Sequence, residues 1–187
     1  LDACQNIERK ILEKENMIFL DINEVVTEYL LQVLKNKDHV LHKIFFDSAT
    51  RAEFEKAFPE ETIFYFPVMN GKYEKTENLV LTGKSLESKS KTIQLDEPET
   101  LIAELETGRL CPALVTSFLS VAFLNQFKCF GSFAQVEYLP MYQKKLAELK
   151  FLKEFEIEKV PTSNLTTGAL GDLSHADIIT SHDIHKF

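Results

Sequence analysis

The chain has 187 residues, of which 44% are hydrophobic, and its 29 Asp and Glu residues outnumber its 21 Lys and Arg residues. This length suits one domain, and the apolar content is sufficient for a folded core. The formal net charge of -8 argues against nucleic acid or an anionic membrane surface as the main partner, because such contacts need clustered lysine and arginine. We therefore expect a small molecule or a protein as the partner.

The cysteines and the start of the chain bear on its location. Cys4, Cys111 and Cys129 are widely spaced and form no CxxC pair, so neither a disulfide framework nor a zinc ribbon is indicated. The opening stretch LDACQNIERKILEKE is charged and lacks the apolar run of a signal peptide. We expect a cytoplasmic protein. Because the sequence begins with Leu1 rather than methionine, we also expect a processed chain or part of a larger protein.

The first elements are expected to be helical. Ile7, Ile11 and Leu12 lie at helical spacing among charged residues, which predicts a short amphipathic helix over residues 2–15. The stretch MIFLD, residues 17–21, predicts a brief strand.

A long helix is expected next. Asn23 can cap it, and it runs to about residue 44, although Asn36 and Asp38 can break it into two. A shorter helix is predicted over residues 49–57, before a proline.

A β-hairpin is the strongest local prediction. The runs TIFYFPVM, residues 62–69, and KYEKTENLVL, residues 72–81, flank Asn70 and Gly71, which tolerate the positive φ angles of a tight turn. Pro67 lacks an N–H for a ladder bond, so the first strand is expected at an edge or with a bulge there.

A strand and two helices are expected after the hairpin. KTIQL, residues 91–95, predicts the strand, and Asp96 begins a capping-box pattern for a helix that stops at Gly108. The next helix, 112–126, is apolar nearly all round, which is typical of a buried helix. Its apolar stretch from 110 to 124 is shorter than the roughly 20 residues that a membrane span needs.

The remaining pattern completes the predicted fold. Residues 133–139 suit a strand, and Pro140 is expected to open an amphipathic helix that reaches about residue 155. Residues 161–187 are expected to form an irregular segment that can pack on the domain formed by residues 1–160. We predict a single α+β domain in which a small, mostly antiparallel sheet packs against several helices, with the 112–126 helix at its centre.

The most favoured place for chemistry is the turn and strand over residues 131–138. On a strand, Gln135 and Glu137 share one face, so Glu137 is the candidate catalytic base and Gln135 a candidate ligand-binding residue. The backbone of Gly131 and Ser132 can offer N–H groups to an anion, and Tyr138 completes the candidate binding set.

Other interpretations of this stretch remain open. The face that carries the two polar residues can be solvent-exposed, or it can pair with Arg109 or Lys128 in a structural network. Cys129 and Ser132 are the nucleophiles that lie near a glycine, but no G-x-S-x-G elbow surrounds them.

Our first expectation is that the chain has no metal site. The alternative is a metal site formed by histidines. His175, His182 and His185 gather near the end of the chain, and imidazole nitrogens are ordinary metal ligands. His39 and His42 lie three residues apart and are a second, weaker candidate pair. The sequence indicates no particular cofactor.

Two hypotheses for function follow from these patterns. The first is a ligand- or partner-binding domain of unknown specificity, since no complete catalytic motif is present. The alternative is a small-molecule enzyme, a transferase or hydrolase, that uses residues 131–138.

Overall fold

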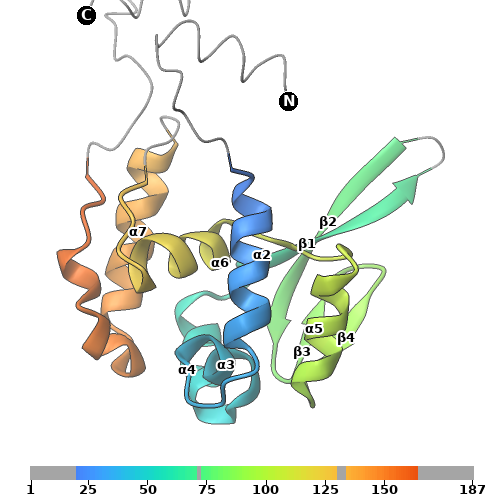
Figure 1. Cartoon of the computed structure of the whole chain (residues 1–187), viewed down its shortest axis with the longest axis horizontal. Helices are drawn as coiled ribbons and strands as arrows, with labels where there is room; N and C mark the ends of the chain where they lie inside the picture. Colours follow the sequence, from blue (N-terminus) through green and yellow to red (C-terminus); the bar gives the residue numbers. More distant parts are fainter. Residues whose placement is uncertain (1–19, 71–72, 130–133, 164–187) are drawn as a thin grey trace, which may run out of the picture.

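The computed structural model describes residues 20–70, 73–129 and 134–163 (Figure 1). These residues form one α+β domain, in which a five-stranded antiparallel sheet of order β4-β3-β2-β1-β5 packs against helices. The predicted fold class is confirmed. The helix expected at 2–15 lies outside the described residues.

Helices make up the first part of the described chain. Their bounds are α2 (Ile22–Val33), α3 (Val40–Phe46) and α4 (Ser48–Ala57). The expected break near Asn36 and Asp38 is confirmed, because a turn separates α2 from α3. The N-cap of α2 is Asp21 rather than the predicted Asn23, because the Asn23 N–H donates to Asp21 Oδ1 at 2.8 Å. Helix α2 therefore starts two residues earlier than expected. Residues 20 and 21, the described end of the predicted 17–21 strand, are not in a strand.

The sheet is built on the predicted hairpin. Its strands are β1 (Thr62–Asn70), β2 (Tyr73–Thr82), β3 (Ser85–Glu87), β4 (Thr92–Gln94) and β5 (Cys111–Pro112). Asn70 pairs with Tyr73, so the connection consists of residues 71 and 72, one residue later than expected. Strand β5 pairs with β1 only at residues 64 and 65, so Pro67 lies, as predicted, on a stretch with one edge unpaired among the described residues.

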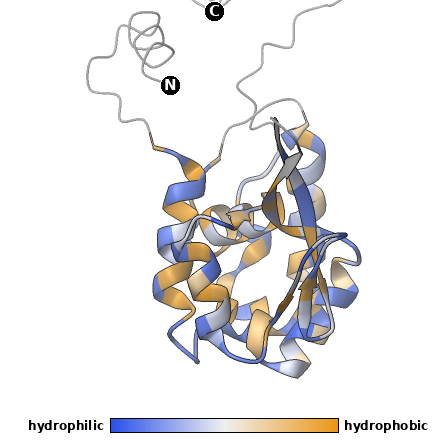
Figure 2. Cartoon of the chain, turned by 90° about the vertical axis from the view of Figure 1, so that its right-hand side faces the viewer, coloured by the Kyte–Doolittle hydropathy of each residue, from blue (hydrophilic) through white to orange (hydrophobic). Residues whose placement is uncertain are grey.

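A bulge in β1 allows two consecutive side chains to enter the core. The register with β2 shifts between Thr62 and Phe64, and Ile63 and Phe64 are both buried. Hydrophobic residues occur on both the helices and the strands (Figure 2), and the buried ones from both form one core cluster.

Helix α5 (Pro98–Glu106) covers part of this sheet and contacts β4. It starts at Pro98 and has no side-chain cap, so the capping box expected at Asp96 is wrong. Pro98 is already suited to the first turn, where its missing N–H costs nothing. The stop at Gly108 is confirmed, because this residue has φ +66° and the Arg109 N–H donates to Glu104 O across the helix end.

The predicted buried helix is confirmed as α6 (Leu114–Phe118), which continues into the π-helix η1 (Leu119–Leu124). Val115, Leu119 and Phe123 are almost fully buried. The expected first residue, Pro112, instead belongs to β5. None of the helices in the described residues is long and apolar enough to cross a membrane.

Helix α7 (Gln135–Ala147) corrects the sequence prediction most clearly. The strand expected at 133–139 is wrong for residues 135–139, which are helical. Gln135, Leu139 and Tyr142 are buried at helical spacing, and their burial outweighs the hydrogen bond that Pro140 cannot make inside the helix. The predicted helix to residue 155 ends instead at Ala147.

Two short 3₁₀-helices follow α7, namely η2 (Lys150–Phe155) and η3 (Ile157–Lys159). The Gln143 side chain of α7 holds the chain beyond them. Its Nε2 donates to the carbonyl oxygens of Ile157 and Val160 at 2.9 and 2.6 Å. Its Oε1 accepts from the buried Thr162 hydroxyl at 2.6 Å. Residues 161–163, the described part of the terminal segment, therefore lie against α7.

Candidate functional site

The polar residues of the predicted 131–138 site do not share a face. Gly131 and Ser132 lie outside the described residues. Gln135 is buried and donates from Nε2 to the Cys129 carbonyl at 2.6 Å, whereas Glu137 is exposed. The reason is the helical period, because residues two apart on a helix point in directions about 160° apart. The strand geometry that brought Gln135 and Glu137 together is thus corrected, and their proposed roles stay predictions.

Tyr138 and Cys129 belong to a partly buried aromatic region. The Tyr138 ring lies 5.5 Å from the Phe118 ring and 5.8 Å from the Tyr142 ring, measured between centroids. Burial raises the pKa of the Cys129 thiol. The thiol is therefore protonated at neutral pH, which makes it a weak nucleophile.

His39 and His42 have structural partners. His42 is buried and donates from Nδ1 to Leu34 O at 2.6 Å. His39 caps α3, since its Nδ1 accepts from the Leu41 N–H at 3.2 Å. Its Nε2 lies 3.2 Å from the Tyr29 hydroxyl. Desolvation, followed by repulsion from His42, lowers the pKa of His39.

The metal alternative at His175, His182 and His185 lies outside the described residues. Within residues 20–70, 73–129 and 134–163, no group of three or more His, Cys, Asp or Glu residues could hold a metal ion. Arg109, one of the expected partners for the 131–138 face, approaches Glu104 at 3.3 Å instead.

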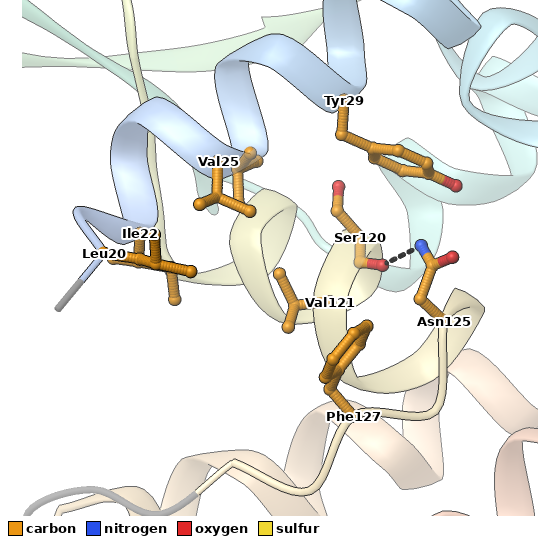
Figure 3. A pocket seen from close by; sticks show the side chains of 9 residues that line it. Leu20, Ile22, Val25, Tyr29, Ser120, Val121, Asn125 and Phe127 are labelled. Carbon is orange, nitrogen blue, oxygen red and sulfur yellow. Dashed lines mark hydrogen bonds between the residues drawn. The ribbon is translucent and has the colours of Figure 1, made fainter. Parts of the chain in front are cut away.

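An apolar groove lies between α2 and η1 (Figure 3). Its volume is about 370 Å³. The α2 wall consists of Ile22, Val25, Val26 and Tyr29. These residues lie on one side of α2 because helical residues three, four and seven apart share a face.

The opposite wall comes from η1 and the chain that follows it. Val121 faces α2 across the groove, and Ser120 and Asn125 lie at the end near Tyr29 (Figure 3). The Asn125 Nδ2 donates to Ser120 O at 2.7 Å. Gln126 then adopts a left-handed conformation with φ 56°, and the Phe127 N–H donates back to Val121 O. This reversal places the Phe127 ring against the groove.

The groove has an unusual exposure pattern. Leu20 is 73% exposed and Phe127 is 64% exposed, and Ile22 and Val25 are also exposed. These four are more than half of the large hydrophobic side chains that the described residues leave exposed; the others are Leu114, Val136 and Met141. Contiguous exposed apolar side chains of this kind mark binding surfaces more often than isolated ones do.

Three further hollows have more polar walls. One, between α3 and η2, combines Lys43, Lys150 and Lys153 with Asp38 and Glu154. Their mixed charges favour neither an anion nor a cation. The second lies beside α2 and carries acidic side chains, and the third lies between α4 and β2. The apolar groove is therefore the best-supported candidate site.

Sequence reasoning missed this groove, although a signal for one wall is present. Ile22, Val25 and Tyr29 lie at i, i+3 and i+7, next to the core stripe of Val26 and Leu30. A second apolar stripe on a helix predicts a second contact surface. No protein-family model, no curated protein and no solved structure matches this chain.

Proposed function

We propose that this protein is a binding module, and that its groove between α2 and η1 receives the apolar face of an amphipathic helix from a partner protein. The observation that carries the proposal is the clustering of exposed Leu20, Ile22, Val25 and Phe127 around one hollow. Grooves of this kind recognise apolar side chains spaced at i, i+3, i+4 and i+7 on a partner helix.

The shape of the groove favours a helix over a small molecule. Its walls are two helical elements, and the side chains at its mouth are largely exposed rather than closed around a cavity (Figure 3). Small-molecule sites bury most of the ligand's surface. A helix laid along α2 covers the exposed side chains without needing an enclosed cavity.

The charged residues on α2 indicate which charge the partner helix carries beside its apolar stripe. Asp21 and Glu28 are exposed, and the helical period places them between the groove and the neighbouring acidic hollow on the far side of α2. A partner helix with lysine or arginine beside its apolar stripe complements these carboxylates. We infer a basic amphipathic helix as the ligand.

The test uses a synthetic peptide with leucines at i, i+3, i+4 and i+7 and with lysine, glutamine and alanine elsewhere. Its control has the same composition in scrambled order, which removes the apolar stripe but keeps the charge. Isothermal titration calorimetry should show saturable binding of the patterned peptide to the full chain and none of the scrambled one. Equal binding of both peptides contradicts the proposal, since charge alone then explains the affinity.

A matched pair of variants locates the binding surface. Ile22 in the groove is 45% exposed and Leu114 outside it is 44% exposed, so replacing either by lysine has a similar effect on folding. Ile22→Lys should weaken peptide binding by at least about tenfold, which corresponds to about 1.4 kcal/mol. Leu114→Lys should leave it unchanged.

A small apolar dye tests whether the groove binds small molecules instead of a helix. If anilinonaphthalene sulfonate binds and is lost in Ile22→Lys, while no patterned peptide binds, the groove is a small-molecule pocket and the partner-helix proposal is wrong. The alternative of a transferase or hydrolase at residues 131–138 stays a prediction. The described residues of that stretch do not bring Gln135 and Glu137 together.

A further inference from the structure

The groove begins where the described chain begins. Leu20 lines it and is 73% exposed, and 19 residues of the chain precede Leu20. The described chain therefore starts at one end of the groove.

The sequence of that segment has the chemistry that the groove requires. Ile7 and Ile11 are one helical turn apart, and they form an apolar stripe if residues 2–15 adopt the predicted helix. Lys10 and Lys14 lie beside this stripe on the same predicted helix. Glu8 and Glu15 border the other side of the stripe, so the segment is amphipathic with mixed charge, and its apolar stripe and adjoining lysines are what match the partner that we infer.

The length of the segment permits it to fold back. A helix over residues 7–15 is roughly 13 Å long, and the α2 wall from Ile22 to Tyr29 is roughly 10 Å long at the same rise per residue. Residues 16–19 span up to about 14 Å when extended. This extended length exceeds the distance of about 8–10 Å that separates the axes of packed helices. A connection of about four residues is also ordinary between two helices.

We propose that residues 7–19 of this chain occupy the groove in the free protein and compete there with the partner helix, an inference that rests on the proposed function. Because the segment is covalently attached, its effective concentration at the groove is on the order of millimolar. Even a weak contact is then populated. A partner must displace the segment, so its apparent affinity is the affinity for the free groove multiplied by the fraction of molecules in which the groove is free.

A fluorescent reporter tests occupancy in the full chain. The chain contains no tryptophan, so Phe127→Trp introduces a single indole at the groove. In this background, Ile11→Lys removes the centre of the apolar stripe. Gln5→Lys is the matched control, because it adds the same charge before the proposed segment and about 120° away from Ile11 on the predicted helix.

Ile11→Lys should move the tryptophan emission to longer wavelength and increase its quenching by acrylamide, whereas Gln5→Lys should change neither. The patterned peptide should bind about tenfold more tightly to the Ile11→Lys protein if the segment fills about nine-tenths of the grooves. The emission should not change over about a hundredfold dilution. A change on dilution would show that a second copy fills the groove, which overturns the inference.

The outcomes separate this inference from the proposed function. If the peptide binds Ile11→Lys and Gln5→Lys equally and their emission is the same, the segment does not occupy the groove, although the groove still binds a helix. If emission responds to Ile11→Lys but no variant binds the patterned peptide more tightly than the scrambled one, the intramolecular contact is supported. In that case the partner-binding function is the proposal that fails.

Discussion

The Thr116 hydroxyl donates a hydrogen bond of 2.7 Å to the carbonyl oxygen of Ile63, and both residues are buried. The Ala113 N–H donates to the same oxygen at 3.0 Å. Ile63 is the extra residue of the β1 bulge, so its carbonyl is turned out of the sheet ladder. These two bonds join the sheet to α6, which continues directly into η1 and so supports one wall of the groove.

Thr116→Val should lower the free energy of unfolding by about 1 kcal/mol. The substitution keeps the shape of the side chain and removes one donor, while Ala113 still satisfies the Ile63 carbonyl. Urea denaturation followed by circular dichroism measures the change. Thr116→Ser is the control, because it keeps the hydroxyl; a larger loss for the serine variant would show that the methyl group, rather than the hydrogen bond, is what matters.

Acid should weaken the cap of α3 through His39. Its Nδ1 must be unprotonated to accept from the Leu41 N–H, and burial lowers the pKa of this imidazole below its ordinary value of 6.5. The unfolded chain therefore binds this proton more readily than the folded one. The contribution to stability is complete above pH 6.5 and is lost as the pH falls from there through the lower folded pKa.

His39→Asn isolates this effect from the titration of other groups. Asparagine keeps a side-chain acceptor for the Leu41 N–H but does not titrate. Denaturation midpoints measured across this pH range should fall more steeply for the original protein than for His39→Asn. Parallel curves would contradict a role for His39 in the pH dependence.

Tyr142→Phe should cost about 1–2 kcal/mol of stability. The Tyr142 hydroxyl donates to Glu61 Oε1 at 2.9 Å, which links α7 to the start of β1. Burial, together with this bond, raises the pKa of Tyr142 well above its usual value. Glu61→Gln keeps an acceptor and should cost less than Tyr142→Phe in the same denaturation experiment; the reverse order would contradict the hydrogen bond as the source.

Gln143→Leu should destabilise the protein by about 2–3 kcal/mol, because it leaves carbonyl groups of Ile157 and Val160 without this donor and the Thr162 hydroxyl without this acceptor. Exposed Lys144 offers a neighbouring control, and Lys144→Leu should change stability little. Limited proteolysis gives a second measurement. Cleavage near residue 160 should accelerate in Gln143→Leu. Equal cleavage of the two variants would show that the Gln143 hydrogen bonds do not hold residues 157–162 in place.

Local rules explain most of the elements predicted correctly. The β1–β2 hairpin follows from two β-rich runs around Asn70 and Gly71, and the buried 112–126 helix follows from its apolar residues on all sides. Gly108 ends α5 because glycine adopts a positive φ without a steric cost. Each of these features depends on residues that are neighbours in the chain.

The start of α7 shows where local rules fail. Pro140 predicts a helix start, since proline is favoured in the first turn and unfavourable inside a helix. The structure places Pro140 inside α7 because burial of Gln135 and Leu139 against the rest of the domain rewards a helix that starts earlier. Because residues 135–139 are therefore helical, Gln135 points into the core and Glu137 points to solvent.

The sequence by itself determined the α+β class, the hairpin, the buried helix and the acidic net charge, because composition and short-range periodicity control these features. The tertiary structure alone decided the groove. Ile22 and Val121 lie far apart in the chain, and only the packing of α2 against η1 brings them to opposite walls of one hollow. No pattern within either segment encodes that approach, because it depends on how separate elements bury their apolar faces together.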